Sequence, residues 1–298
     1  MKRVVVVTGA GTGLGRAYAL DLASRGLRVV VNNRRREVDD SGLGSAQKVA
    51  REICDRGGEA IANEDDARDP ASGQRLVDQA LGAWGRLDAL VANAGVDQHK
   101  TFHKISLDEF RDIFEINFFG TLFATHAAYA HMRAQGHGRI VVSTSSAGLH
   151  GLHGLSAYSA SKAALIGLMR SLAAEGKSHD VLSNAVAPYA ATRMTSNHDD
   201  AHFRDTMRPE YVAPLVALLV SERCRLNGQT IVAGGGRFRR ASTVEGKGVV
   251  YDAPADMTPL NLEEDMSELI SLEGAREFTD AMAAFKDFSS HRPALERT

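Results

Sequence analysis

Short apolar runs alternate with segments of helical periodicity along the first 235 residues. The first run, 4–8, is almost entirely valine, which is typical of a strand buried on both faces. Similar runs predict six more strands, at 27–32, 59–63, 87–92, 139–145, 181–187 and 229–233. The intervening segments predict helices, the longer ones at 46–56, 70–84, 107–133, 155–175 and 210–221. This alternation predicts a doubly wound parallel sheet of seven strands with helices on both faces.

The pattern changes after Gly236. Three arginines, at 237, 239 and 240, precede an acidic segment at 262–273 and a last helical stretch that ends near Phe288. Phe278, Met282 and Phe285 recur at spacings of four and three, which predicts an amphipathic helical face that needs cover. We therefore expect a sheet domain at 1–236 and a helical C-terminal extension at 237–298 that packs on the core or on a partner subunit. A free linker is the alternative.

Composition excludes several classes of protein. The 298 residues carry a net charge of −2, which gives no reason to expect binding to nucleic acid or to an anionic membrane. No apolar run is long enough to span a bilayer. Cys54 and Cys224 lie far apart without metal-ligand spacing, so we expect neither a metal site nor a structural disulfide. Two basic residues precede the first strand and glycines follow it, so we expect no signal peptide and a cytoplasmic location.

A glycine-rich turn lies between the first strand and the first helix. It reads Thr-Gly-Ala-Gly-Thr-Gly-Leu-Gly over residues 8–15. Glycines let the backbone approach a pyrophosphate, and the helix N-terminus attracts its charge. A plain tight turn is the alternative, but the flanking strand and helix favour dinucleotide binding. The candidate cofactor residues here are Gly9, Gly11, Thr12, Gly13, Leu14 and Gly15.

Other polar residues follow the second, third and fourth strands. In parallel sheets of this kind ligands bind at the carboxyl ends of strands, and an acid after the second strand selects NAD whereas an Arg favours NADP. Here the acid is absent and Asn33-Arg34-Arg35-Arg36 follows, which slightly favours NADP over NAD. A solvated charge run is the alternative. The further cofactor candidates are Asn33, Arg34, Asp66, Ala67, Asn93, Ala94 and Gly95.

The region 145–162 holds the candidate acid/base chemistry. Tyr158 and Lys162 lie one turn apart on the same face of a predicted helix. A lysine ammonium beside a phenol lowers the pKa of the phenol towards the range of a general acid/base. This pair alone also arises by chance on surface helices. Asn117 lies within an apolar helical face and is either a satisfied core amide or a site residue.

These ordered motifs resemble those of the short-chain dehydrogenase/reductases over residues 1–235. Asn93-Ala94-Gly95 resembles the Asn-Asn-Ala-Gly turn of that family, with Ala92 in place of the first Asn, and Ser145 lies thirteen residues before Tyr158, as in the family. The resemblance implies a Rossmann-like fold and assembly as homodimers or homotetramers.

The family resemblance also implies a role for each candidate catalytic residue. Ser145 is expected to bind the carbonyl oxygen of the substrate, and Tyr158 to exchange its proton. Lys162 is expected to lower the pKa of Tyr158 and to hold the nicotinamide ribose, and Asn117 to hold a water that links Lys162 to solvent. Nicotinamide contacts are expected at Pro188 and Thr192, although Tyr189 stands where the family usually has Gly.

A narrower resemblance covers nearly the whole chain. Short segments at 175–177, 193–195 and 209–215, together with the extension, are similar to the (3R)-hydroxyacyl-CoA dehydrogenase unit of type 2 peroxisomal multifunctional enzymes. This implies a small-molecule substrate, best a 3-hydroxyacyl-CoA, with bulky or steroid-derived acyl groups included. Asn33 stands where that unit has an acid. The alternatives are a free steroid, sugar or polyketide ketone as substrate, or a non-catalytic dinucleotide-binding sensor.

Overall fold

The computed structural model of the chain describes residues 1–35, 42–192, 194, 201–251 and 254–290. The chain divides into two compact units, Met1–Arg240 and Ala241–Thr298, and each is considered by itself. Within the described ranges no helix combines the length and the apolar character needed to cross a membrane.

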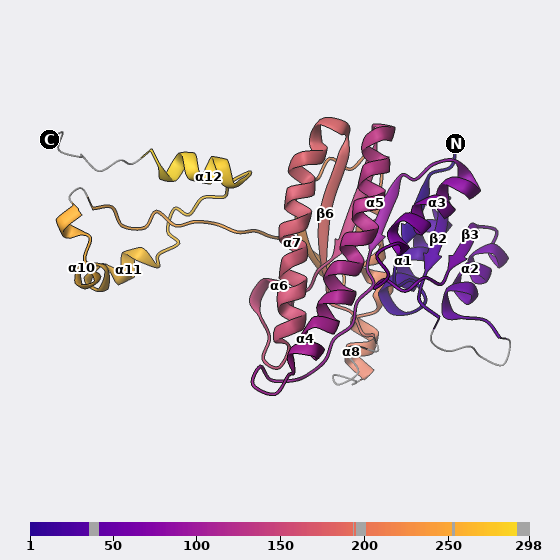
Figure 1. Cartoon of the computed structure of the whole chain (residues 1–298), viewed down its shortest axis with the longest axis horizontal. Coiled ribbons are helices and arrows are strands. Elements are labelled where there is room, and N and C mark those ends of the chain that lie inside the picture. Colours follow the sequence, from indigo (N-terminus) through magenta and orange to yellow (C-terminus); the bar gives the residue numbers. More distant parts are fainter. Residues whose placement is uncertain (36–41, 193, 195–200, 252–253, 291–298) are drawn as a thin grey trace. The chain divides into compact units, whose positions relative to one another are not determined.

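The first unit is built on one sheet, whose strand order is β3-β2-β1-β4-β5-β6-β7-β8 (Figure 1). Neighbouring strands from β3 to β7 pair in parallel, which confirms the doubly wound parallel sheet. The strand order reverses between β1 and β4, and a crevice for ligands opens at such a point. The strands are β1 Val4–Val7, β2 Arg28–Asn32, β3 Glu59–Asn63, β4 Ala89–Ala92, β5 Gly138–Ser143, β6 Val181–Pro188, β7 Thr230–Gly234 and β8 Arg237–Ala241.

The eighth strand corrects the sequence-based expectation of seven. Gly235 and Gly236 have φ values of 55° and 73°, so two residues in the left-handed region close a tight turn between β7 and β8. A two-residue connection joins antiparallel strands, which makes the sheet mixed at this edge. The sequence of β8, Arg-Phe-Arg-Arg-Ala, lacks the apolar alternation of a half-buried strand. Charged side chains of this kind are common on edge strands, where they prevent pairing with another chain. The three arginines assigned to the extension therefore lie on a strand of the sheet.

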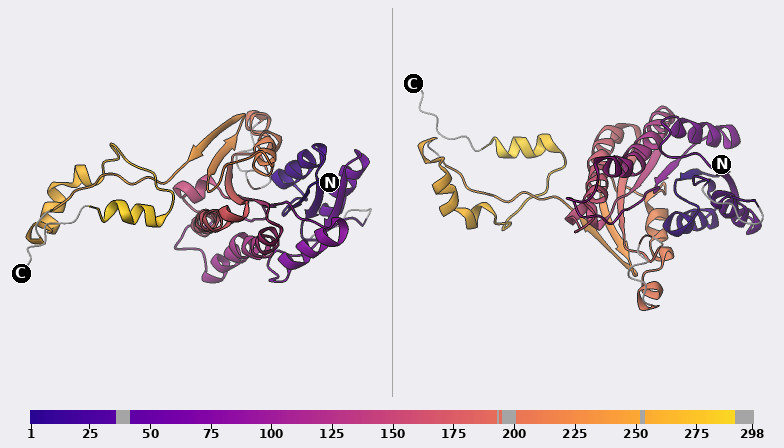
Figure 2. Two further views of the ribbon diagram at one scale, coloured as in Figure 1. Left: turned by 90° about the horizontal axis from the view of Figure 1, so that it is seen from above. Right: turned by 60° about the horizontal axis from the view of Figure 1, so that its bottom comes forward.

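Helices cover both faces of the sheet (Figure 2). Valines of β1 alternate between the two cores, with Val5 and Val7 in one and Val4 and Val6 in the other, because successive side chains of a strand point to opposite faces. The first core holds side chains of α1 Gly13–Ser24, α2 Ser45–Asp55 and α9 Ala213–Leu219. The second core holds side chains of α3 Ser72–Trp84, α5 Gly120–Gln135 and α7 Ser156–Gly176.

Two helical predictions need correction. The long helix expected at 107–133 is divided into α4 Leu107–Phe114, a π-helical turn η1 Glu115–Phe119 and α5. The region 189–209, for which no helix is predicted above, contains the short helix α8 Ala201–Thr206. Residues 193 and 195–200 of that region, like Arg36 of the basic run, lie outside the described residues.

The second unit contains short helices and one pair of bridged residues. Glu245 and Arg276 form an isolated antiparallel bridge, and the helices are α10 Pro259–Glu264, α11 Met266–Leu269 and α12 Ala281–Phe288. Phe278 precedes α12, so the expected amphipathic face is formed only in part. Met282 and Phe285 are 71% and 62% exposed, and none of the described residues of this unit is buried. The unit therefore has apolar side chains without a core of its own.

Candidate active site

A cavity of about 510 Å³ opens at the carboxyl ends of β1, β2 and β4. It gathers most of the predicted cofactor residues, namely Gly9, Thr12, Gly13, Leu14, Gly15, Asn33, Arg34, Asp66, Ala67, Asn93, Ala94, Gly95 and Thr192. Four other predicted cofactor residues do not line it, namely Gly11, Tyr158, Lys162 and Pro188. Six lining residues were missed from the sequence, and most adjoin a predicted position: Asn32, Asp65, Val96, Asp97, Ile116 and Met194.

The glycine turn is packed directly against the turn after β4. Gly9 has φ +63°, and a Cβ at this position would lie 2.8 Å from the Cα of Ala94. The Thr8 hydroxyl accepts hydrogen bonds from the backbone N–H groups of Asn93 and Ala94, at 3.0 and 3.1 Å. Thr12 is the N-cap residue of α1, but its side chain accepts no hydrogen bond from the helix. The first residues of α1 line the cavity, and the Thr12 side chain does not occupy their backbone amides. Amides at a helix N-terminus beside a side-chain-free turn fit the pyrophosphate of a dinucleotide.

Arg34 and Asn33 lie at the end of the cavity near β2. Arg34 Nη1 is 3.3 Å from Asp66 Oδ2, whereas Arg68 Nη2 is 2.7 Å from the same oxygen. The hydrogen bond from Arg68 is the main reason that the pKa of Asp66 falls to about 2. Asn33 Nδ2 donates to Ser45 Oγ at 2.7 Å. Arg34 is therefore the more weakly held of the two cations on Asp66, and it lines the cavity.

Ser145 and Tyr158 meet where two helices begin. Ser145 is the N-cap of α6 Ser146–His150, and its hydroxyl accepts from the Ala147 N–H at 3.1 Å. Tyr158 lies in the first turn of α7. Burial raises the pKa of Tyr158 above its ordinary value, and a hydrogen bond with the Ser145 side chain acts in the opposite direction. The two hydroxyls can therefore bind one substrate oxygen together.

The expectation that Lys162 lowers the pKa of Tyr158 stays a prediction, and the structure shows where the lysine lies. Lys162 Nζ lies over the Tyr158 ring, 5.8 Å from its centroid, and donates to the Ser143 carbonyl oxygen at 2.8 Å. Burial lowers the pKa of Lys162 itself to about 8. The ammonium thus donates to a backbone carbonyl, and burial has the largest effect on the pKa of the phenol.

Asn117 is buried in the π-helical turn and holds the backbone that follows Gly95. Its Nδ2 donates to the Val96 carbonyl at 2.9 Å and to Ser161 Oγ at 3.0 Å, and its Oδ1 accepts from the Val96 N–H at 2.8 Å. Both protons of the Asn117 amide therefore have protein acceptors. A water that links Lys162 to solvent, as predicted, would need a donor other than this side-chain amide. A Cβ on Gly95 would lie 3.2 Å from both Asn117 Oδ1 and Lys162 Nζ, so a side chain there would crowd both groups. π-helical turns often mark functional sites.

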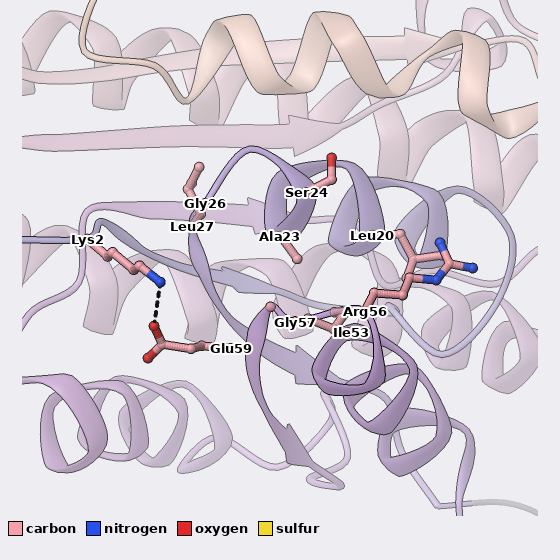
Figure 3. Close-up of a pocket in the computed structure, with 11 residues that line it drawn as sticks. Lys2, Leu20, Ala23, Ser24, Gly26, Leu27, Ile53, Arg56, Gly57 and Glu59 are labelled. Atoms are coloured by element: carbon pink, nitrogen blue, oxygen red, sulfur yellow. Dashed lines mark hydrogen bonds and ion pairs between the residues drawn. The ribbon is translucent and has the colours of Figure 1, made fainter.

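A second cavity, of about 250 Å³, lies at the opposite ends of the strands (Figure 3). Its wall includes Leu20 and Ile53, and its edge carries the ion pair between Lys2 Nζ and Glu59 Oε1 at 2.8 Å. Ligands of doubly wound sheets bind at the carboxyl ends of the strands, so this cavity does not belong to the candidate active site.

Comparison with known proteins gives consistent matches. The family model described as short chain dehydrogenase matches residues 3–202. A short-chain type dehydrogenase/reductase of Mycobacterium tuberculosis is 39% identical over 276 residues, which cover 92% of this chain and 96% of the relative. The peroxisomal multifunctional enzyme type 2 of Mus musculus is 38% identical over 276 residues, 92% of this chain but 37% of the relative. A crystal structure of a short chain dehydrogenase from Mycobacterium avium matches with a TM-score of 0.80 and 37% identity, over 92% of this chain and 96% of that one.

Proposed function

Since the chain belongs to the short-chain dehydrogenase family and is an NAD(P)-dependent oxidoreductase, we propose that it interconverts a 3-hydroxyacyl-CoA and the corresponding 3-oxoacyl-CoA. The observation that carries the oxidoreductase chemistry is the placement of Ser145 at the N-cap of α6 and of Tyr158 in the first turn of α7, with Lys162 over the Tyr158 ring. Support for the thioester comes from the match to a multifunctional enzyme of type 2, which covers 92% of the chain and therefore includes part of the second unit.

Five candidate site residues have separate tasks in this proposed reaction. The bound nicotinamide supplies or accepts the hydride. Ser145 donates a hydrogen bond to the substrate oxygen, where negative charge develops. Tyr158 exchanges a proton with that oxygen. Lys162 holds the nicotinamide ribose, and Pro188 and Thr192 contact the nicotinamide amide.

We further propose that NADP is accepted at least as well as NAD. Arg34 lines the cavity and shares Asp66 with the more tightly bound Arg68. A guanidinium that reaches a phosphate forms a charge-assisted hydrogen bond, which is about twice as strong as a neutral one. The absence of an acid at Asn33 removes the usual repulsion of the additional phosphate.

Assembly and the handling of the CoA group are part of the same proposal. We propose a homodimer or homotetramer that forms through the regions 107–133 and 155–175. The exposed Arg237, Arg239 and Arg240 are candidates to bind the phosphates of CoA. Sedimentation velocity measures the assembly, and the salt dependence of KM for a CoA ester measures the charge contribution.

The deciding experiment is steady-state oxidation of 3-hydroxyacyl-CoA esters of increasing chain length, with NAD and with NADP. Bulky esters of the steroid-side-chain type are included, and free steroid, sugar and polyketide ketones are the comparison set. Turnover of the thioesters above all free ketones supports the proposal. Turnover of free ketones alone would replace the substrate class, and cofactor binding without any turnover would indicate a dinucleotide sensor.

A further inference from the structure

The segment 95–100 runs from the cofactor cavity to the start of α7 and is fastened at both ends. At one end Val96 exchanges two hydrogen bonds with the Asn117 amide, at 2.8 and 2.9 Å. At the other end the Lys100 N–H donates to the Gly154 carbonyl at 2.8 Å, and Lys100 pairs with Leu155 in an isolated bridge. Tyr158 follows three residues after Leu155, so this segment forms a fixed wall that ends beside the first turn of α7.

Asp97 is the acidic residue of this wall. It lines the cavity, and 21% of its side chain is exposed. Its carboxylate lies 4.0 Å from His99 Nε2, and among the described residues it has no closer cationic partner. Lys162 does not neutralise it, because that ammonium is buried and donates to Ser143. A weakly compensated negative charge therefore faces the site.

The negative charge of Asp97 affects the phenol of Tyr158, the group that is proposed to exchange the proton. Its negative charge raises the pKa of Tyr158, in addition to the effect of burial. The geometry agrees with this effect, because Asp97 lines the cavity and its segment is joined through Lys100 to the start of the helix that carries Tyr158. A substrate whose oxygen is bound by Tyr158 and Ser145 would place its neighbouring atoms in the same field.

We propose that Asp97 is a specificity-determining residue that rejects substrates with a negative charge next to the reacting carbon. In a 3-hydroxyacyl or 3-oxoacyl thioester, one methylene separates the reacting carbon from a neutral thioester carbonyl. In the free 3-hydroxy or 3-oxo acid, a carboxylate occupies that position and meets Asp97. Like charges in contact disfavour the wrong ligand, and this is a common means of discrimination. The inference rests on the proposed function and defines which form of the substrate the site accepts.

The test compares ethyl 3-oxobutanoate with 3-oxobutanoate, which differ in the charge at that position. The quantity measured is the ratio of kcat/KM for ester over acid, with the reduced cofactor saturating. We expect Asp97→Asn to lower this ratio by about tenfold or more, the equivalent of roughly 1.4 kcal/mol of lost repulsion. A change in the pKa of Tyr158 affects both ketones equally, so the ratio isolates the charge effect. The matched control is Asp108→Asn, because the side chain of Asp108 is 89% exposed on α4.

The conservative variant Asp97→Glu keeps the charge and is expected to preserve the wild-type ratio. A wild-type enzyme that does not distinguish ester from acid overturns the inference, and so does an unchanged ratio in Asp97→Asn. Failure of the proposed function is separate from both. It appears as absent turnover of 3-hydroxyacyl-CoA esters in the wild type, while the ester-to-acid ratio still responds to Asp97.

Discussion

Lys162 Nζ donates a hydrogen bond to the backbone carbonyl oxygen of Ser143 at 2.8 Å, and the lysine side chain is almost completely buried. One carbonyl dipole stabilises the ammonium less than water does. Burial accordingly lowers the pKa of Lys162 from 10.5 to about 8. The protein without cofactor therefore holds a cation that its fold disfavours.

This burial predicts a pH-dependent stability difference between wild type and Lys162→Met. The folded pKa lies below the unfolded value, so the unfolded state binds more protons between pH 8 and 10.5, and stability rises with pH in that window. Below it the buried charge costs about 3 kcal/mol, the equivalent of the change in pKa. We expect Lys162→Met to gain stability relative to wild type at pH 7 and to lose much of that gain by pH 10. Urea unfolding of both proteins without cofactor measures this, and a difference that does not vary with pH contradicts it.

Tyr158→Phe is expected to abolish turnover. The variant removes only the hydroxyl that exchanges the proton, because the ring keeps its place at the start of α7. Cofactor affinity is expected to stay near that of the wild type, since the lining of the cavity is unchanged. Steady-state kinetics and cofactor titration on the same preparation separate the two effects. Retention of more than about a tenth of kcat would refute this assignment, since a positioned acid/base group typically contributes at least a hundredfold.

The sequence predicts well those features that a local pattern determines. The glycine turn and the residues after the second, third and fourth strands line one cavity because parallel strands end at one edge of the sheet. Strand β8 was missed because an edge strand with three arginines has no apolar period. The direction of Lys162 towards Ser143 and the binding of Val96 by Asn117 depend on contacts across 19 and 21 positions. Local periodicity carries no information about such contacts.

Arg34→Ala is expected to weaken NADP binding more than NAD binding. If the guanidinium reaches the additional phosphate, its loss costs about 1.5–3 kcal/mol, which is roughly a tenfold to hundredfold rise in Kd for NADP. Fluorescence titration with both cofactors measures the two values. Arg35→Ala is the matched control, because Arg35 belongs to the same basic run but does not line the cavity. Equal losses for both cofactors, or tighter binding of NAD than NADP by more than tenfold in the wild type, would contradict the proposal.

Truncation after Ala241 is expected to impair both assembly and catalysis. The second unit has no buried residue among those described, yet it carries exposed apolar side chains such as Ile270, Met282 and Phe288. Apolar surface of this extent is typical of a segment that packs against another surface. A cut after Ala241 rather than Gly236 keeps β8, so the sheet of the first unit stays complete. Sedimentation velocity, thermal unfolding and kcat/KM for a 3-hydroxyacyl-CoA ester compare the truncated and full chains, and a truncated protein that matches the full chain in all three would show that the extension is a free appendage.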